Sequence, residues 1–518
     1  MRIGVDFDNT IVRYDALFHR VALEQKLIPP DLPVNKSEVR NHLRKTGCEP
    51  LWTEMQGCVY GSRMSEAEPF PGVIEFFQDC RRANIPVSII SHKTRHPFIG
   101  ERHDLHAAAL NWLELQGFFD PAKIGLPRDE VYFELTKDAK LERIAERRCD
   151  RFIDDLPELL SEPAFPKIDR ILFDPADLYA AETQFIRFRS WAEILESFRM
   201  ERFTASNGFN QATVEPMSGG GNNRVYRVSV GLRQGVVKHY FSHRGDMRDR
   251  FASERAFYTY LWTRGIRRTP EPLAWNPDHR LALFSFVDGR KLSPGEVNNS
   301  AVNQAVEFIV ELNQDRKNAR NIPSASEACF SLTDHLSVVD NRIVRLQQIE
   351  PFNAIDGQAL EFVQNALQPA WLRRRNLLLT HGDWASDRVL SPSDFGFHNA
   401  LLGADGRFRF FDFEYAGWDD PAKLICDFFC QPQIPAPRKY WDQFTKTLAA
   451  ALGLDDSLPQ RARALLPAYQ IKWCCIMLNE FARNDRERRD FAHGAATSEQ
   501  RKIAQLAKAR AAIQSLLI

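Results

Sequence analysis

The chain has 518 residues, which is too many for one ordinary hydrophobic core and enough for two or three. Lys and Arg together number 68, as do Asp and Glu, so the formal net charge is zero and no block of like charge indicates a nucleic-acid or polybasic membrane-binding surface. The nine cysteines lack paired C-x-x-C spacing, which argues against a zinc site and favours buried thiols in a reducing compartment.

Targeting signals are not evident in the sequence. The chain opens on a short apolar run without a basic segment or a cleavage site, and no stretch reaches eighteen uncharged apolar residues. We therefore expect a cytoplasmic protein without a membrane span that acts on small molecules and not on nucleic acid. The helix-like segment 498–518 could pack on its own domain or pair with a second subunit, so the sequence leaves an oligomer open.

A change of pattern near residues 198–211 indicates a domain boundary. There the helix-like SWAEILESFRM gives way to the polar FTASNGFNQ. We predict a first domain over 1–202 and a second over 203–518, the latter divided into lobes at about 205–290 and 291–518.

Short apolar runs that end in polar side chains recur in the first domain, at 3–7, 86–91, 151–155 and 170–174. Segments with apolar residues at helical spacing separate them, such as 72–84 and 137–148. This alternation predicts an α/β domain with a doubly wound, Rossmann-like parallel sheet, whose strand ends share one edge. The long insertion between the first two runs, 12–84, predicts a small helical cap that selects the substrate.

The polar ends of these runs suit phosphoryl chemistry. Asp6 could attack phosphorus to form an aspartyl phosphate, and Asp8 could protonate the leaving oxygen and then deprotonate water. Asp6, the carbonyl of Asp8 and a carboxylate of Asp154 or Asp155 could hold Mg²⁺, while Ser91 donates to a phosphoryl oxygen and a lysine balances charge. Either aspartate pair alone would indicate only a turn or a helix N-cap, but both pairs at strand ends favour a site.

These residues resemble the four motifs of haloacid dehalogenase superfamily phosphatases, over roughly 1–200. The first motif, D-x-D-x-T, is matched by Asp6, Asp8 and Thr10; Ser91 matches the second, and Asp154-Asp155 the fourth. For the third, Lys137 and Lys140 are both candidates, and we prefer Lys140. The resemblance implies a Mg²⁺-dependent phosphatase acting on a small phosphate ester.

The second domain opens with short strands over 212–241, joined by a turn that contains Gly219, Gly220 and Gly221. Glycines let backbone N–H groups approach phosphates, and Lys238 could reach the phosphates of a nucleotide, held by Glu254 sixteen residues later. Each feature alone is weak, since a glycine-rich turn usually marks only a hairpin. The chain then becomes helical, so we predict an α+β, two-lobed, protein-kinase-like domain.

The segment 390–429 carries the strongest signal. Asp394 precedes Asn399 by five residues, and an apolar run ends at Asp412. In phosphoryl transfer to a hydroxyl, one carboxylate receives the hydroxyl proton while an amide and a second carboxylate hold Mg²⁺ against the phosphates. Asp394 is suited to the first task, and Asn399 and Asp412 to the second.

This pattern resembles the aminoglycoside phosphotransferase and choline/ethanolamine kinase family, over roughly 205–518. Asp394 and Asn399 match its D-x-x-x-x-N loop, Asp412-Phe413-Glu414-Tyr415 its metal-binding D-F-E-Y, and Asp427 a later structural aspartate. The resemblance implies ATP and Mg²⁺ as cofactors and a small-molecule hydroxyl as acceptor. One departure is Pro392, where the family usually has histidine. His381-Gly382-Asp383 is a competing match, but Arg388 then occupies the metal-ligand position, so we assign Asp383 a structural or substrate-side role.

The sequence as a whole predicts a bifunctional enzyme, a phosphatase fused to a small-molecule kinase. Two alternatives remain at this stage. The kinase-like domain could sense a nucleotide without transferring phosphate, or the kinase could be active beside a non-catalytic first domain.

Overall fold

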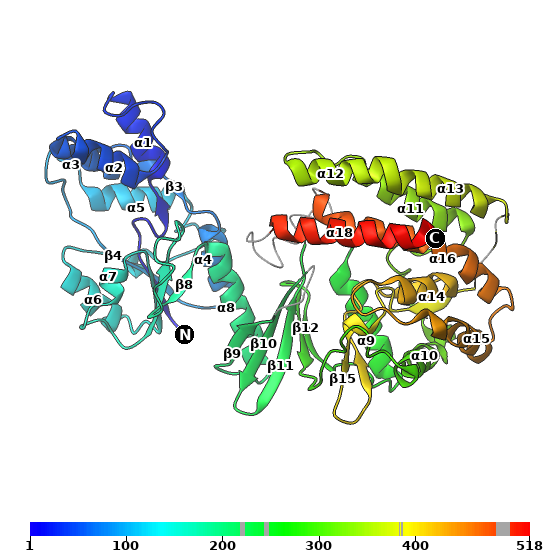
Figure 1. Ribbon diagram of the computed structural model, residues 1–518. Helices are drawn as coiled ribbons and strands as arrows, with labels where there is room; N and C mark the ends of the chain where they lie inside the picture. Colours follow the sequence, from blue (N-terminus) through cyan, green and yellow to red (C-terminus); the bar gives the residue numbers. More distant parts are fainter. Residues whose placement is uncertain (218–222, 243–247, 383, 385–386, 483–497, 518) are drawn as a thin grey trace. The chain divides into compact units, whose positions relative to one another are not determined.

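The computed structural model describes residues 1–217, 223–242, 248–382, 384, 387–482 and 498–517 (Figure 1). The chain forms two compact units, Met1–Met200 and Glu201–Ile518. Among the described residues, no helix is long and apolar enough to cross a membrane.

The amino-terminal unit is built on a six-stranded sheet in the order β5-β4-β1-β6-β7-β8. All five neighbouring strand pairs are parallel, as the sequence predicts. The chain order reverses on the two sides of β1, so the loops after β1 and β6 meet at the point where ligands bind in such sheets. The strands are Ile3–Val5 (β1), Val87–His92 (β4), Val131–Glu134 (β5), Arg151–Asp154 (β6), Asp169–Phe173 (β7) and Ile186–Phe188 (β8).

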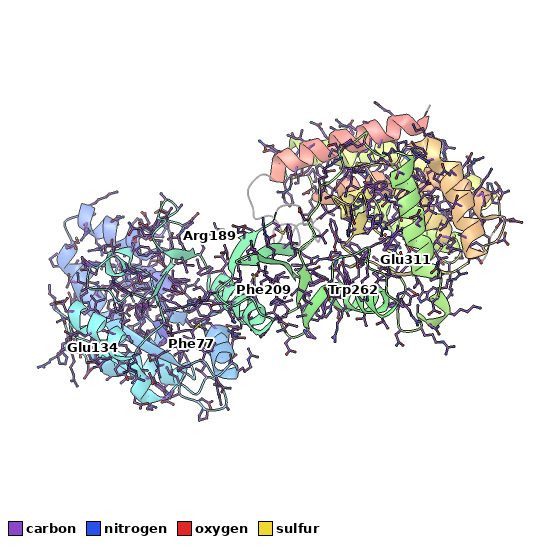
Figure 2. All side chains as sticks on the ribbon, turned by 90° about the horizontal axis from the view of Figure 1, so that it is seen from below. Phe77, Glu134, Arg189, Phe209, Trp262 and Glu311 are labelled. Atoms are coloured by element: carbon purple, nitrogen blue, oxygen red, sulfur yellow. The ribbon has the colours of Figure 1, made fainter. Side chains whose placement is uncertain are left out.

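Both faces of this sheet are buried, because successive strand residues point to opposite sides. Ile89 and Ile153 belong to one apolar cluster, whereas the adjacent Ile90 and Phe152 belong to another. Phe77 on α4 packs in the first cluster (Figure 2). The helices around the sheet are Val73–Arg82 (α4), Leu105–Leu115 (α5), Lys137–Glu146 (α6), Pro157–Leu160 (α7) and Trp191–Ser206 (α8).

A helical insertion between β1 and β4 forms the expected cap. It begins and ends at a two-stranded pair, Val12–Arg13 (β2) with Glu68–Pro69 (β3). Between these lie Asp15–Glu24 (α1), Lys36–Lys45 (α2) and Glu49–Tyr60 (α3). The third of these helices, α3, is held by apolar packing, with Trp52 stacked on Phe18 of α1 at 4.8 Å between ring centroids.

The helix α8 is longer than the sequence pattern indicates. It continues through Ser206, so the polar residues FTAS belong to the helix and the break in structure comes after it. Phe209 follows and packs on the sheet of the carboxy-terminal unit, where a Cβ added at Gly235 would lie 3.0 Å from its ring (Figure 2). Glycine therefore allows the close approach of this aromatic ring.

The carboxy-terminal unit starts with a five-stranded antiparallel sheet in the order β12-β13-β11-β10-β9. The helix α9 lies between its third and fourth strands along the chain. The elements are Thr213–Pro216 (β9), Arg224–Val230 (β10), Arg233–His239 (β11), Arg250–Thr263 (α9), Pro272–Asn276 (β12) and Leu281–Ser285 (β13).

The rest of this unit is mainly helical and shares one large apolar cluster. Two short antiparallel pairs, Val389–Ser391 (β14) with Gly417–Asp419 (β17) and Ala400–Leu402 (β15) with Phe408–Phe410 (β16), carry the predicted catalytic segment. The last helix packs on its own unit, since Leu506, Ala509 and Ile513 are buried in the cluster. The helices are Asn299–Asn313 (α10), Leu332–Leu346 (α11), Ala354–Phe362 (α12), Gln368–Leu379 (α13), Pro421–Cys430 (α14), Trp441–Leu452 (α15), Leu458–Met477 (α16) and Ser498–Leu517 (α18).

Candidate functional sites

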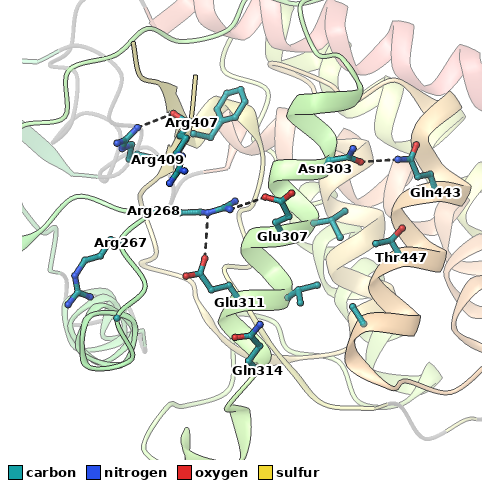
Figure 3. A pocket seen from close by; sticks show the side chains of 15 residues that line it. Arg267, Arg268, Asn303, Glu307, Glu311, Gln314, Arg407, Arg409, Gln443 and Thr447 are labelled. Atoms are coloured by element: carbon teal, nitrogen blue, oxygen red, sulfur yellow. Dashed lines mark hydrogen bonds and ion pairs between the residues drawn. The ribbon is translucent and has the colours of Figure 1, made fainter. Parts of the chain in front are cut away.

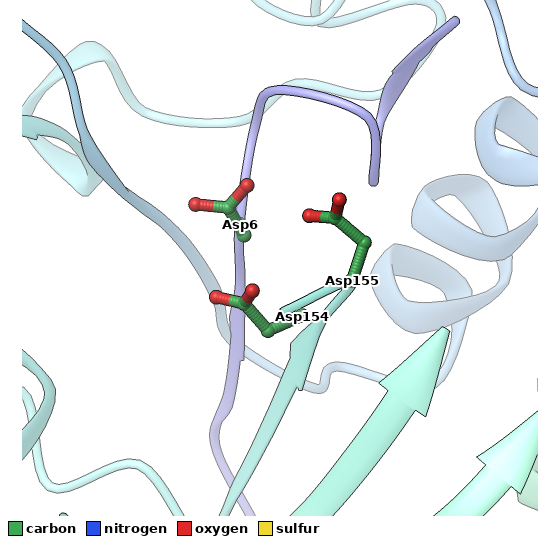
Figure 4. Close-up of side chains that lie close together, drawn as sticks. All are labelled: Asp6, Asp154 and Asp155. Carbon is green, nitrogen blue, oxygen red and sulfur yellow. The ribbon is translucent and has the colours of Figure 1, made fainter. Parts of the chain in front are cut away.

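Three carboxylates meet where the sheet order of the amino-terminal unit reverses (Figure 4). Asp6 follows β1, and its backbone N–H donates to the carbonyl of Ile153 at 2.9 Å. Asp154 ends β6 and Asp155 follows it. Oxygen atoms of Asp6, Asp154 and Asp155 all lie within 4.8 Å of one another. The structure therefore brings together the aspartates of the first and fourth predicted motifs.

The lysine beside these carboxylates is Lys140. Its Nζ lies 2.6 Å from Asp6 Oδ1 and 2.6 Å from Asp154 Oδ2, and its side chain is 3% exposed. Lys137, one turn earlier on α6, is half exposed and pairs with Glu162. Of the two candidates for the third motif, the structure places Lys140 at the site.

Two carboxyl groups of this cluster, Asp6 and Asp155, have raised pKa values. Burial raises the pKa of Asp6 to about 7, against the opposing effect of Lys140 and with a further increase from the charge of Asp154. Burial and the charges of Asp154 and Asp6 also raise the pKa of Asp155 well above its ordinary value. Closely spaced carboxylate oxygens are the donor set that Mg²⁺ prefers, so the residues present fit this ion.

Asp8 lies two residues after Asp6 and is held by two donors. Tyr14 Oη donates to Asp8 Oδ1 at 2.5 Å, and Lys93 Nζ donates to both carboxylate oxygens at 3.0 and 2.9 Å. Burial opposes ionisation of Asp8, but Lys93 and the Tyr14 hydrogen bond outweigh it and lower the pKa of Asp8. The geometry suits a carboxylate that can accept a proton from water.

Lys93 was missed in the sequence, although it stands two residues after Ser91 at the end of β4. Ser91 is 1% exposed and Lys93 is 4% exposed, so both side chains are inside the unit. A lysine directly after a predicted buried strand, near a predicted phosphate-binding serine, is a signal that could have found it. The imidazole of His106 contacts the Lys93 carbonyl at 2.8 Å and helps to fix this turn.

The cap also contributes to this site through Lys36, the first residue of α2. Lys36 Nζ donates to Asn9 Oδ1 at 3.0 Å and lies 5.5 to 5.7 Å from the ring centroids of Tyr14, Phe18 and Tyr60. The loop it reaches is fixed from the other side, since Trp191 Nε1 donates to the carbonyl of Thr10 at 2.9 Å. Sequence spacing gave no sign of Lys36, because the cap fold alone brings it to residue 9.

The second site contains a lysine–glutamate pair that the sequence predicted. Lys238 on β11 and Glu254 on α9 are joined by a contact of 2.6 Å between Nζ and Oε2. Glu254 also accepts from Tyr240 Oη at 2.7 Å and from the backbone N–H of Phe413 at 2.9 Å. Glu254 is 1% exposed, so it is a fixed support that ties the sheet to the 412–414 segment.

Asp412 lies directly beside this pair. Lys238 Nζ is 2.5 Å from Asp412 Oδ1 and 3.5 Å from Glu414 Oε2. Oxygens of Glu254, Asp412 and Glu414 lie within 4.8 Å of one another. Burial raises the pKa of Asp412 to about 7, against Lys238 and with the charges of Glu414 and Glu254 adding to it. This donor set also fits Mg²⁺, and it includes Glu414 besides the predicted ligand Asp412.

Asp394 and Asn399 form a compact loop after β14. Asn399 Nδ2 donates to the Asp394 carbonyl at 3.0 Å, and Asn399 accepts from the backbone N–H of Phe411 at 3.0 Å through its own carbonyl. The second bond places Asn399 beside the chain that leads into Asp412. The predicted phosphate-binding Gly219, Gly220 and Gly221 and the competing Asp383 lie outside the described residues.

His398 is a partner of Asp394 that the sequence did not predict. Its Nε2 lies 3.1 Å from Asp394 Oδ1, and the ring is 8% exposed. Burial opposes ionisation of Asp394, but His398 and the charge of Lys472 lower its pKa. An imidazole thus supports Asp394 from four residues downstream, whereas Pro392 stands at the upstream position where the family usually has histidine.

A cavity of about 360 Å³ opens beside Asp394 and His398. The later aspartate, Asp427, also lines it and is bound by Lys472 Nζ at 2.8 and 2.9 Å and by Trp473 Nε1 at 2.9 Å. A separate cavity of about 1010 Å³ lies between α10, α15 and β16 (Figure 3). Its charges are largely paired, as in the contacts of Arg268 with Glu307 and Glu311, and its described lining includes none of the predicted site residues.

Comparison with protein families gives one match in this unit. Residues 213–465 match the phosphotransferase enzyme family. The carboxy-terminal unit is phosphotransferase-like. The matched range includes Lys238, Glu254, Asp394, Asn399 and Asp412. No curated protein matches the sequence.

Three of the solved structures that align with this chain are reported by their sequence identity, coverage and TM-score. They include choline kinase LicA from Streptococcus pneumoniae (13% identity, 62% of this chain and 99% of that chain, TM-score 0.41) and an ethanolamine kinase from Plasmodium vivax (15%, 59% and 83%, 0.39). A choline kinase from Cryptosporidium parvum is 15% identical, over 63% of this chain and 98% of that chain, with a TM-score of 0.38.

Proposed function

We propose that the carboxy-terminal unit transfers the γ-phosphate of ATP to a hydroxyl of a small metabolite. The observation that carries this proposal is the contact of the Lys238–Glu254 pair with Asp412, beside the Asp394–Asn399 loop. Lys238 would bind nucleotide phosphates, and the glycine-rich turn would supply backbone donors. Asn399 and Asp412 would hold Mg²⁺, which supplies charge neutralisation to the phosphates when bound.

Asp394 is the base in this proposal. Its side chain is 34% exposed and lines the cavity of about 360 Å³, so an acceptor hydroxyl can reach it. The hydroxyl oxygen forms a bond to the γ-phosphorus while its proton passes to Asp394. The bond from the γ-phosphorus to the bridging oxygen breaks, and ADP leaves with that electron pair. His398 and Asn399 keep the carboxylate of Asp394 oriented toward the cavity.

Three substitutions test these roles. Asp394→Ala should abolish transfer and leave Mg²⁺-ATP binding nearly intact, because the base contacts the acceptor and not the nucleotide. Asp412→Ala should weaken nucleotide binding as well, since it removes a metal ligand. Calorimetric ATP titration and ADP release would measure both. An Asp383→Ala variant that binds ATP without turnover, together with an active Asp394→Ala variant, would move the base to Asp383.

We propose a second activity, hydrolysis of a small phosphate ester, for the amino-terminal unit. The supporting observation is Lys140 bridging Asp6 and Asp154 at the reversal point of the parallel sheet. Asp6 would attack phosphorus while the bond from phosphorus to the ester oxygen breaks, and protonated Asp8 would give that oxygen its proton, so that the alcohol leaves. Asp8 would then take a proton from the water that attacks the aspartyl phosphate, which releases inorganic phosphate and frees Asp6. Asp6, Asp8, Asp154 and Asp155 would hold Mg²⁺, which offsets the phosphoryl charge when bound, and Ser91 would bind a phosphoryl oxygen.

Hydrolysis of a generic aryl phosphate tests this second activity. Asp6→Asn should lower turnover by several orders of magnitude, because no neighbouring group can form the covalent intermediate. Comparable Mg²⁺-dependent hydrolysis by a folded Asp6→Asn protein would remove Asp6 as the nucleophile. A chain without any hydrolysis would favour the alternative in which the first unit is a non-catalytic partner of the kinase.

The two proposed activities would act on different phosphate ester bonds. If both acted on one ester, their combined result would be ATP hydrolysis alone. We therefore propose a fusion in which one domain, about 1–202, removes a phosphate and the other, about 203–518, installs one at a different hydroxyl of a cytoplasmic metabolite. The acceptor would be a sugar, an amino alcohol or a nucleotide-linked intermediate. ATP binding without turnover under all acceptors would instead favour a nucleotide sensor.

A further inference from the structure

Lys36, the first residue of the cap helix α2, is placed among the groups of the amino-terminal site. Its Nζ donates to Asn9 Oδ1 at 3.0 Å, and Asn9 directly follows Asp8. The ammonium also lies 5.5 to 5.7 Å from the ring centroids of three aromatic residues, Tyr14, Phe18 and Tyr60. The other lysines and arginines of the cap are exposed or form ion pairs with carboxylates of the cap. The cap therefore contributes Lys36 to the site.

The three lysines near this site differ in their partners. Lys140 and Lys93 each hold carboxylates of the site, at 2.6 Å and at 2.9 to 3.0 Å. Among the residues that the structure describes, no carboxylate forms an ion pair with Lys36, whose hydrogen bonds are to the neutral groups of Asn9 and Tyr60. An ammonium held by neutral oxygens gains Coulomb energy when it exchanges one of them for a charged oxygen. Lys36 can make this exchange without leaving a carboxylate unpaired.

The charge of Lys36 acts on the carboxylates of the site. Burial lowers the pKa of Lys36, but Tyr60, Asp8 and Asp155 outweigh burial and raise it above its ordinary value, so the ammonium is charged at neutral pH. Burial raises the pKa of Asp155, and Lys36 is among the charges that oppose this rise. The ammonium therefore lies near Asp8, the proposed proton donor, and near the carboxylates that would hold Mg²⁺. This is the side on which a phosphoryl group bound at Asp6 would meet the cap.

The balance of charge at the site gives Lys36 a task. The carboxylates of the site are those of Asp6, Asp8, Asp154 and Asp155. Lys93, Lys140 and a bound Mg²⁺ would offset these four negative charges, so a phosphate monoester, which brings about two more at neutral pH, would enter without compensation. The proton on Asp8 that the leaving alcohol takes supplies one positive charge. Lys36 supplies the second, and the total then matches the charge of the ester.

We propose that Lys36 is a further catalytic residue of the hydrolysis, whose ammonium leaves Asn9 and binds a non-bridging oxygen of the phosphoryl group. This inference rests on the proposed phosphatase function. While Asp6 forms its bond to phosphorus and the bond to the ester oxygen breaks, that oxygen takes the proton of Asp8 and leaves with the alcohol. Lys36 is not consumed, because it contacts an oxygen that stays on phosphorus. Its charge offsets that of the phosphoryl group in this step and when water attacks the aspartyl phosphate.

Hydrolysis of a generic aryl phosphate by the full chain measures this role. Lys36→Met keeps an apolar stem and removes the ammonium, and it should lower kcat about a hundredfold to a thousandfold, the usual effect of losing one donor to a developing charge. Lys36→Arg keeps the positive charge and should be at least about tenfold more active than Lys36→Met. Lys45→Met, at the exposed end of the same helix, is the matched control and should stay within about twofold of wild type.

Two further measurements separate a catalytic contact from a purely structural one. Methionine suits a site lined by the rings of Tyr14, Phe18 and Tyr60, so the melting temperature of Lys36→Met should rise or stay within about 2 °C of wild type. Asn9→Gly removes the amide oxygen that Lys36 contacts and allows the φ of 58° at this position. Asn9→Gly should lower kcat far less than Lys36→Met, because the ammonium can still reach the phosphoryl group.

Inorganic phosphate gives a readout that does not depend on turnover. Calorimetric titration of the full chain in the presence of Mg²⁺ should show that Lys36→Met binds phosphate at least about tenfold more weakly than wild type, because one contact between opposite charges is lost. Lys45→Met should bind phosphate as wild type does. Equal affinity of Lys36→Met and wild type for phosphate would contradict a contact between Lys36 and the phosphoryl group.

The possible failures are distinguishable. If wild type hydrolyses the aryl phosphate and Lys36→Met keeps at least about a third of its kcat, the role of Lys36 is overturned and the phosphatase proposal stands. An Asn9→Gly variant as inactive as Lys36→Met, with no recovery in Lys36→Arg, also overturns this role, since Lys36 would then only hold the loop that contains Asp8. Absence of hydrolysis in folded wild type overturns the phosphatase proposal and this inference with it.

Discussion

Replacement of Lys238 by methionine tests how charge is balanced at the proposed nucleotide site. Lys238 contacts Glu254 at 2.6 Å and Asp412 at 2.5 Å, and it lies 3.5 Å from Glu414. Methionine keeps a similar apolar stem and removes only the ammonium group. The Lys238→Met variant therefore removes the ammonium group from among three carboxylates whose oxygens lie within 4.8 Å of one another, and of these Glu414 still has the Arg250 guanidinium at 4.0 Å.

The expected loss of folding stability in Lys238→Met follows from this geometry. Two charges 4.8 Å apart repel by about 3.5 kcal/mol at an effective dielectric constant of about 20. Asp412 can relieve part of this by binding a proton, since its pKa is already about 7. The repulsion between Glu254 and Glu414 remains. We expect a loss of about 3–5 kcal/mol, the usual cost of removing one partner from a buried ion pair, or about 5–10 °C in the melting temperature of this unit.

Differential scanning calorimetry of the full chain, with and without millimolar Mg²⁺, measures the effect. Mg²⁺ should stabilise Lys238→Met more than the wild type, because the ion replaces the missing positive charge. Lys446→Met on α15 is the control: Lys446 is exposed, and its loss should change stability by less than about 0.5 kcal/mol. A Lys238→Met variant as stable as this control, with no added response to Mg²⁺, would refute our description of the site.

Three further predictions concern other groups. Lys140→Ala should abolish aryl phosphate hydrolysis, whereas Lys137→Ala, which loses only a surface pair with Glu162, should stay within about twofold of wild type in the same assay. Arg342 holds the pKa of Glu327 at about 2 despite burial, compared with the ordinary 4.5. The pair therefore stabilises the fold above about pH 4.5, and this stabilisation is lost as the pH falls toward 2. The difference in melting temperature between wild type and Arg342→Met should shrink over that range. Chelation by EDTA should stop both activities, and added Mg²⁺ should restore both.

Strand ends were the most predictable part of the molecule. Asp6, Asp154, Ser91 and Asp412 each follow a short apolar run, and a parallel or paired strand fixes where its last residue points. The lysine–glutamate pair was also predictable, because a lysine on a strand and a glutamate on the next helix meet in this arrangement. In these cases the residue type and its place at the end of a strand or on the following helix were enough to predict which side chains meet.

Residues brought in by tertiary packing could not be predicted. Lys36 reaches Asn9 only because the cap folds back over the first strand, and His398 supports Asp394 through the shape of a single turn. The end of α8 was misjudged for a related reason: Thr204 and Ser206 look like loop residues, but each hydroxyl donates to a carbonyl three residues earlier within the helix.

The proposed function requires two independent phosphoryl-transfer centres in one chain. Assays of the full-length Asp6→Asn and Asp394→Ala variants, for both aryl phosphate hydrolysis and acceptor-dependent ADP release, test whether the two centres are separate. We predict that Asp6→Asn loses hydrolysis and keeps ADP release, while Asp394→Ala loses ADP release and keeps hydrolysis. If either folded variant loses both activities or neither, the claim of two separate centres is contradicted.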